Sequence, residues 1–155
     1  MAADNFAVIL ARTASSTLPI GTINADGSSP EQVELYYLSV SSLATPTTAR
    51  YQLVVQRCTS TGTGVPVTPT YLGVTGSPPT ASTDAAQEHT VAPTYTAGAY
   101  LLNEGFHQGS SFKFWAVAGR GLSLPATASA GMAFLTPIGP AASVVLTAHI
   151  AEGAP

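Results

Sequence analysis

Charged side chains are scarce in this chain. Asp, Glu, Lys and Arg together make up only 8% of its 155 residues, whereas about 25% is typical of a soluble domain. The polar part of its surface must therefore come mainly from Thr, Ser, Gln and Asn. Because few like charges repel one another, copies of such a domain associate readily. The composition favours a surface that is largely buried in an assembly. A neutral surface without functional meaning is the alternative.

Basic residues are too few for a nucleic-acid interface. The chain has five Lys and Arg residues, scattered between Arg12 and Arg120, and its net charge is −3. Nucleic-acid binding relies on a stripe of cations that contacts successive phosphates. We therefore expect no nucleic-acid partner.

Long hydrophobic runs are also missing. The apolar run from Phe6 to Ala11 is far shorter than the ~20 residues that span a bilayer. Asp4 precedes this run, where a signal peptide would carry positive charge. The single Cys58 excludes an internal disulfide. These absences predict synthesis in a cytoplasm and no membrane partner.

The sequence contains no recognisable catalytic or metal-binding motif. His89, His107 and His149 lie far apart and lack zinc-type spacing. There is no G-x-S-x-G motif, and the eight acidic residues are too dispersed to select a catalytic pair. Cys58, at the end of an apparent strand, is more typical of a small buried residue than of a reactive thiol. We expect no enzyme activity, no cofactor and no metal.

Strand patterns dominate the chain, whereas twelve Pro and fourteen Gly interrupt almost every window long enough for a helix. Residues 50–58 give the clearest pattern, because Tyr51, Leu53 and Val55 share one face of an alternating stretch. Further strands are predicted at 5–11, 33–40, 70–74, 90–95, 100–102, 111–118, 131–135 and 143–151. Turn clusters lie at 24–27, 61–64, 76–79 and 137–140.

About eight or nine short strands with this spacing predict one all-β domain over residues 1–155. The expected architecture is an antiparallel β-sandwich of the jelly-roll or Ig-like type. The polar tract around 76–88 is expected to form an exposed loop.

The segment from Phe112 to Ala118 alternates like a strand with aromatic side chains. Phe112 and Phe114 share one face, and Lys113 and Trp115 share the other. We interpret the segment as a central strand packed on both sides, with Trp115 in the core. The alternative is a sugar-binding platform around Trp115, because aromatic rings offer large apolar faces. The tyrosines expected to contribute to it are Tyr36, Tyr37, Tyr71, Tyr95 and Tyr100.

Gly119 and Gly121 flank Arg120 and allow a tight turn with positive φ. The segment is either a hairpin turn with a solvated arginine or a contact in which Arg120 forms a bidentate pair with a carboxylate of an adjacent subunit. The residues leave both interpretations open.

The run from Phe114 to Ala128, FWAVAGRGLSLPATA, resembles the late part of small structural proteins encoded beside capsid genes in tailed bacteriophages. The strands expected at 51–57, 131–135 and 143–152 also resemble that family, so the likeness covers about two thirds of the chain in the order of its elements. Ala118 departs from the family pattern, in which a proline would precede the Gly-Arg-Gly turn.

The resemblance implies a β-sandwich virion protein of the capsid decoration, or cement, type. Copies of the chain, expected to form a homo-oligomer such as a trimer, would bind the major capsid protein from outside and stabilise the lattice through many weak contacts. The expected assembly contacts are Arg120, Gly119, Gly121, Asn5 and Phe6. The alternative functions are a carbohydrate-binding module on a phage surface and a head–tail or tail structural subunit.

Overall fold

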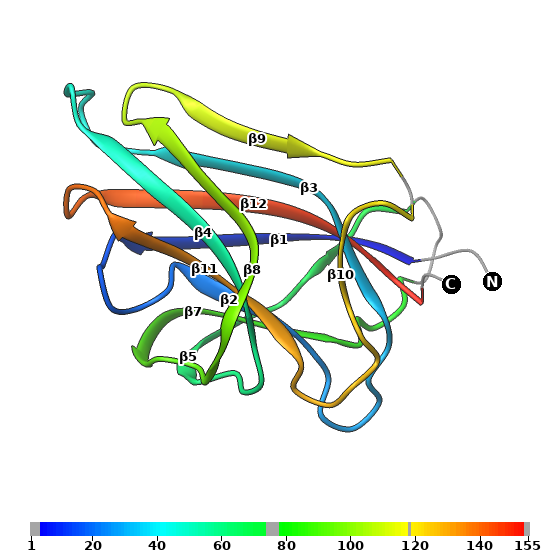
Figure 1. Ribbon diagram of the computed structural model, residues 1–155. Coiled ribbons are helices and arrows are strands. Elements are labelled where there is room, and N and C mark those ends of the chain that lie inside the picture. Colours follow the sequence, from blue (N-terminus) through cyan, green and yellow to red (C-terminus); the bar gives the residue numbers. More distant parts are fainter. Residues whose placement is uncertain (1–3, 74–77, 118, 154–155) are drawn as a thin grey trace.

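The computed structural model describes residues 4–73, 78–117 and 119–153, and within them twelve strands form two antiparallel six-stranded sheets (Figure 1). Sheet A contains β1 (Asp4–Thr13), β3 (Val33–Ser42), β6 (Thr70–Tyr71), β9 (Ser111–Trp115), β10 (Leu122–Leu124) and β12 (Ser143–Glu152). Sheet B contains β2 (Gly21–Ala25), β4 (Arg50–Cys58), β5 (Thr63–Val67), β7 (Thr83–Val91), β8 (Tyr95–His107) and β11 (Gly131–Ile138). The predicted all-β fold with antiparallel sheets, consistent with a β-sandwich, is confirmed.

The order in sheet A is β10-β3-β12-β1-β6, and β9 also pairs with β3. β9 lies beside residues 37–41 of β3, and β10 lies beside residues 33–35, so these two short strands share one edge of the sheet. The order in sheet B is β5-β7-β2-β11-β4-β8. Successive strands β1 to β4 alternate between the sheets, which places the two layers face to face (Figure 1).

The core lies between the sheets and is formed by alternate residues of the long strands. β1 contributes Phe6, Val8 and Leu10, and sheet B contributes large side chains such as Tyr51 and Phe134, all at most 1% exposed. The expectation that Phe6 is an assembly contact is wrong. Its side chain points between the sheets, where burial of apolar surface stabilises it, and it cannot reach a partner.

Several predicted boundaries shift in the structure. The strand at 50–58 is found as predicted, but the one at 90–95 is interrupted: β7 ends at Val91, β8 begins at Tyr95, and Pro93 between them has no N–H for a ladder. The loop expected around 76–88 is strand from Thr83 onward, because β7 pairs with both β2 and β5. Positions 74, 76, 77 and 118 lie outside the described residues.

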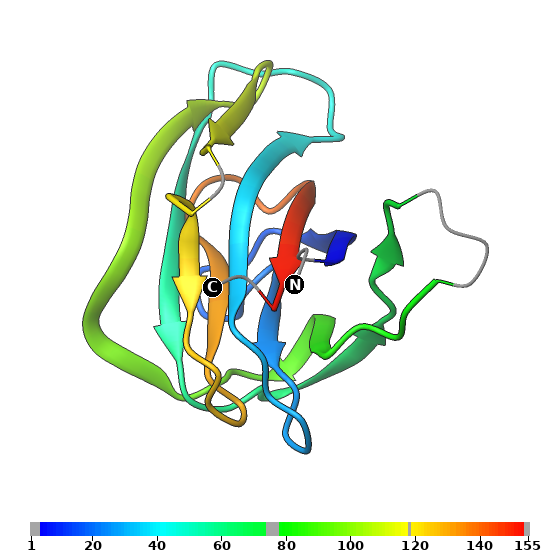
Figure 2. The same cartoon turned by 90° about the vertical axis from the view of Figure 1, so that its right-hand side faces the viewer.

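The two ends of the sandwich differ. β1 and β12 pair from Asp4↔Glu152 onward. β1 therefore begins, and β12 ends, at the end of the sandwich that faces the viewer in Figure 2. The opposite end, which we call the distal end, is formed by four connections: 14–20, 43–49, 108–110 and 139–142 (Figure 1). Hydrogen bonds join them, from Ala14 N to Ala142 O, from Leu43 N to Ser143 O and from Gln108 N to Ala49 O.

Candidate functional site

A β-bulge in β3 places two tyrosines side by side on the outer face of sheet A. His149 of β12 pairs with Tyr37, and the next residue, Ile150, pairs with Leu35, so Tyr36 is an extra residue in β3. Leu35 is fully buried, whereas Tyr36 and Tyr37 are both partly exposed. A bulge of this kind re-aims side chains that strict alternation would send to opposite faces.

Four aromatic rings from three strands meet at this bulge. The Tyr37 and Trp115 ring centroids are 5.1 Å apart with planes at 80°, and those of Tyr37 and His149 are 4.7 Å apart. The Tyr36 and His149 ring centroids are 6.0 Å apart. The pairing of Tyr37 with Trp115 on β9 and with His149 on β12 explains why these residues meet. We call Tyr36, Tyr37, Trp115 and His149 the aromatic platform.

Trp115 is 73% exposed, so its interpretation as a core residue is wrong. β9 lies at an edge of sheet A, where it pairs with β3. Phe112 and Phe114 face inward and pack against the core, and the alternation of the strand then sends Lys113 and Trp115 outward. The outer face of the sheet leaves the indole accessible.

The platform borders an open depression of about 440 Å³. Its lining consists of Tyr36, Tyr37, Ser39, Trp115, Ala116, Thr147 and His149. Burial raises the pKa of the Tyr36 phenol, so its hydroxyl is protonated at neutral pH and both donates and accepts hydrogen bonds. The depression combines aromatic faces with hydroxyl groups and one imidazole.

The structure unites only part of the predicted sugar platform. Tyr36 lies beside Trp115, but Tyr71 is on β6 at the opposite edge of sheet A, where its ring packs on Phe6 at a centroid distance of 5.6 Å. The inclusion of Tyr71 is therefore wrong, and so is that of Tyr95 and Tyr100, which lie on β8 in sheet B. The sequence-based prediction omitted His149. One signal for the bulge was available, because Leu35 and Leu38 are three residues apart and break the period of two.

Glu34 holds the Gly-Arg-Gly turn through the backbone. Its Oε2 accepts a hydrogen bond from Gly119 N at 2.9 Å, and its Oε1 accepts one from Gly121 N at 2.6 Å. Gly119 has φ +77°, and a Cβ on Gly121 would lie 2.4 Å from the Leu35 carbonyl oxygen, so both glycines are required. Backbone N–H groups that converge on one anion in this way form a nest.

The Arg120 side chain is exposed at the tip of this turn, and within the described part of the chain its guanidinium has no hydrogen-bond or ion-pair partner. Gly119 is exposed and Gly121 is half-buried. Asn5 is also exposed, and its carbonyl accepts a hydrogen bond from Leu72 N. Contact of these residues with another subunit stays a prediction.

A second group of polar side chains is buried at sheet B. His89 Nε2 lies 3.0 Å from the Thr61 carbonyl oxygen and 3.4 Å from Thr22 Oγ1. Burial lowers the pKa of His89, so the ring is neutral at pH 7.

Burial raises the pKa of the Cys58 thiol to about 11. The thiol is therefore protonated and buried, which confirms that Cys58 is a packed residue.

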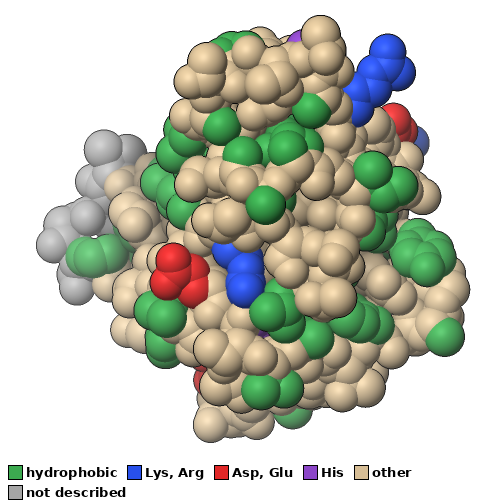
Figure 3. Space-filling model, turned by 90° about the vertical axis from the view of Figure 1, so that its left-hand side faces the viewer, with side chains coloured by type: hydrophobic (Ala, Val, Ile, Leu, Met, Phe, Trp, Pro, Cys, Tyr) green, Lys and Arg blue, Asp and Glu red, His purple; other side chains and the backbone are tan. Residues whose placement is uncertain are grey.

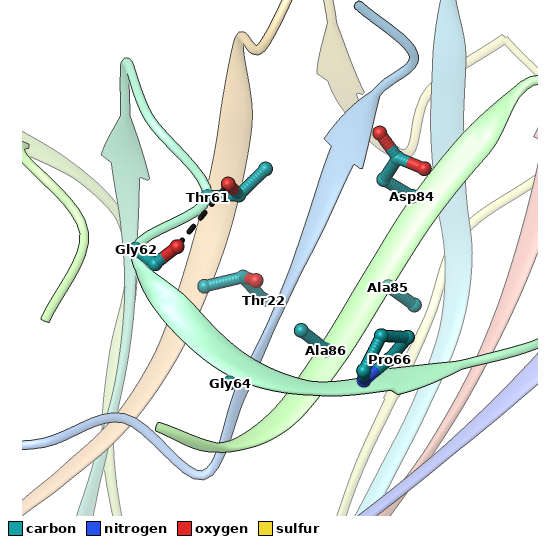
Figure 4. A pocket seen from close by; sticks show the side chains of 8 residues that line it. All are labelled: Thr22, Thr61, Gly62, Gly64, Pro66, Asp84, Ala85 and Ala86. Atoms are coloured by element: carbon teal, nitrogen blue, oxygen red, sulfur yellow. Dashed lines mark hydrogen bonds between the residues drawn. The ribbon is translucent and has the colours of Figure 1, made fainter. Parts of the chain in front are cut away.

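Beside this group, a pocket of about 190 Å³ opens between the β5 connection, β2 and β7 (Figure 4). Its lining residues are Thr22, Thr61, Gly62, Gly64, Pro66, Asp84, Ala85 and Ala86. Asp84 is the ionisable side chain among them, and burial followed by the nearby Asp26 carboxylate raises its pKa. A lone carboxylate supplies neither a nucleophile with its base nor a set of metal ligands. Residues 4–73, 78–117 and 119–153 contain no cluster of three His, Cys, Asp or Glu arranged to hold a metal ion.

Glu152 is 4% exposed near the ends of β1 and β12, and its carboxylate accepts a hydrogen bond from Ser82 N at 2.7 Å. Burial raises its pKa, the Glu31 and Asp4 carboxylates raise it further, and hydrogen bonding offsets only part of this rise. The ionised form is thus disfavoured in the folded state. Stability should fall as the pH rises from the ordinary glutamate range through the raised pKa.

Glu152→Gln is therefore expected to increase the free energy of unfolding at pH 7, because it removes the buried charge and keeps an acceptor for Ser82 N. The gain should shrink as the pH falls toward 4, where Glu152 of the parent chain is protonated. Urea unfolding between pH 4 and pH 8 measures both effects. Glu104→Gln, at an exposed position, is the control. A Glu152→Gln variant that is destabilised equally at every pH would contradict this account.

The described residues include no helix of the length and hydropathy needed to cross a membrane. The chain matches no model of a known protein family and no curated protein.

Proposed function

We propose that this chain is a virion structural subunit that binds the outside of a capsid lattice, as a decoration or cement protein does. The observation that carries the proposal is the distal end, where large apolar side chains are exposed on a surface with little charge. Leu43 is 68% exposed and Ile138 is 64% exposed there, and Pro46 in the connection after Leu43 is exposed as well. Figure 3 faces this end and shows few charged side chains among hydrophobic and uncharged groups.

The strand order supports a jelly roll. Strands β1, β12, β3 and the β9/β10 edge follow one another in sheet A, and β2, β11, β4 and β8 follow one another in sheet B. Eight strands in two such sets are the jelly-roll arrangement, which occurs in viral capsid domains and in lectins. β5, β6 and β7 are then an insertion between β4 and β8 that extends both sheets. Many unrelated functions occur on one fold, so capsid binding is the property to measure.

Because a lattice repeats the same contact many times, weak contacts at the distal end are enough to hold the subunit on a capsid. Burial of a leucine-sized side chain contributes about 1.5–3 kcal/mol, and an oligomer multiplies such contacts without requiring a large interface in each copy. Because like charges are few, copies can sit close together on a lattice at little electrostatic cost. A head–tail or tail subunit shares these properties, and the copy number per particle separates the two roles.

Leu43→Ser together with Ile138→Ser is expected to weaken binding to capsids that lack this subunit by about 100-fold, because two buried apolar contacts are lost per copy. Co-sedimentation of purified protein with such capsids measures the affinity, and analytical ultracentrifugation of the free protein tests for the expected trimer. The matched control is Leu72→Ser, which changes a 44% exposed side chain beside Asn5, at the end opposite the distal end.

Equal binding of the double variant and the parent chain would show that the interface is not at the distal end. A parent chain that stays monomeric and binds no capsid would contradict the proposed function.

A further inference from the structure

We propose that the aromatic platform is a binding site for an uncharged glycan, with one pyranose ring stacked on Trp115. The site lies on the outer face of sheet A, whereas the proposed capsid contact is the distal end. The inference is therefore independent of the proposed function.

The exposure of Trp115 is the first support. Indole is the largest side chain in proteins, and leaving it 73% exposed forgoes much stabilisation from burial. Tyr37 supports the ring from one side in an edge-to-face contact at 5.1 Å. Aromatic side chains lose little conformational entropy on binding, because they have only two rotatable bonds. Trp115 thus offers a broad apolar face that is already held in place.

The polar groups around Trp115 can form hydrogen bonds with the hydroxyl groups at the edge of a sugar ring. Ser39 and Thr147 line the same depression, and their hydroxyls both donate and accept hydrogen bonds. The phenols of Tyr36 and Tyr37 and the ring nitrogens of His149 add further donors and acceptors. An entirely apolar occupant would leave these groups without partners in a dehydrated contact, which is unfavourable.

Charge decides between classes of glycan. The seven residues that line the depression include no Asp, Glu, Lys or Arg, so the lining matches a neutral ligand. Lys113 shares the outward side of β9, two residues along the strand from Trp115, and pairs with the lining residue Ser39. An acidic glycan held by Lys113 is therefore the comparison that an experiment must include.

The depression has the dimensions of a small-ligand site. Its volume of about 440 Å³ falls within the roughly 300–1,000 Å³ that is usual for such sites. It is open to solvent, so a longer saccharide can continue beyond it. The bulge at Tyr36 is what places both tyrosines on this face, and bulges are frequent next to functional sites.

A glycan array followed by titration calorimetry on the purified chain tests the inference. The parent chain is expected to bind neutral saccharides, and Trp115→Ala to weaken that binding about 30-fold or more, as for a central aromatic contact. Tyr100→Ala is the matched control, because Tyr100 is a 59% exposed aromatic residue on β8. It should bind as the parent does, and thermal unfolding should show that both variants are folded.

Three results would overturn the inference: no binding to any neutral glycan, binding that survives Trp115→Ala, or binding restricted to acidic glycans and lost in Lys113→Ala. In the first case, loss of self-association in Trp115→Ala would identify the platform as a contact between copies. Capsid co-sedimentation of Trp115→Ala, and glycan binding by the Leu43→Ser/Ile138→Ser variant, separate this site from the proposed function.

Discussion

Replacement of Phe6 by alanine is expected to lower the free energy of unfolding by about 3–5 kcal/mol. Phe6 is 1% exposed and stands in the core between the two sheets. Truncation removes its buried apolar surface and leaves a cavity that the surrounding sheets cannot fully close, since strand pairing fixes their spacing. Its contact with Tyr71, which lies on the edge strand β6, would be lost as well. Urea denaturation with linear extrapolation measures the change.

Ile9→Ala provides the control for this prediction. Ile9 is in the same strand, three residues later, but points outward and is 59% exposed. It should change stability by less than about 1 kcal/mol. Similar losses of stability in both variants would mean that the Phe6 side chain is not packed in the core and is available to a partner.

Replacement of Glu34 by alanine is expected to release the Gly-Arg-Gly turn without unfolding the domain. The Glu34 carboxylate accepts the two backbone N–H groups of Gly119 and Gly121, and hydrogen bonds to charged groups contribute about 1.5–3 kcal/mol each. Amide hydrogen exchange at Gly119 and Gly121 should then become about 10- to 100-fold faster. Exchange at core amides of β4 and β11 should change much less.

Glu34→Gln refines this second prediction. An amide side chain offers one carbonyl acceptor, and its NH2 group faces the other backbone N–H as a second donor. Exchange should therefore accelerate strongly at one glycine and weakly at the other. Unchanged exchange at both glycines in Glu34→Ala would show that the turn is held by something other than this carboxylate.

The fold class was predictable because the alternation of Tyr51, Leu53 and Val55 is a local property of the chain. β2 and β5 were not predictable in the same way. β2 carries Thr22 and Asn24 on its outward side, and both are buried only because distant segments cover them. β5 contains Pro66, which a central strand would exclude, but β5 is an edge strand and tolerates it.

The aromatic platform depended on information that no local pattern contains. Trp115 alternates with Phe112 and Phe114 whether or not a further layer covers sheet A, so the sequence identifies the two faces of β9 but does not identify the solvated one. The contact of His149 with Tyr36 and Tyr37 joins residues more than one hundred positions apart. The Gly-Arg-Gly turn was visible as a motif, whereas its attachment to Glu34 was not.

The pairing of Asp4 with Glu152 has a practical consequence for engineering. The backbone enters and leaves the sandwich at adjacent points on the side away from the distal end. A passenger protein or affinity tag joined at either terminus would project from that same side. If the distal end docks on a particle, such fusions would be displayed outward, and a scaffold built from this domain could carry cargo without obstructing its own attachment.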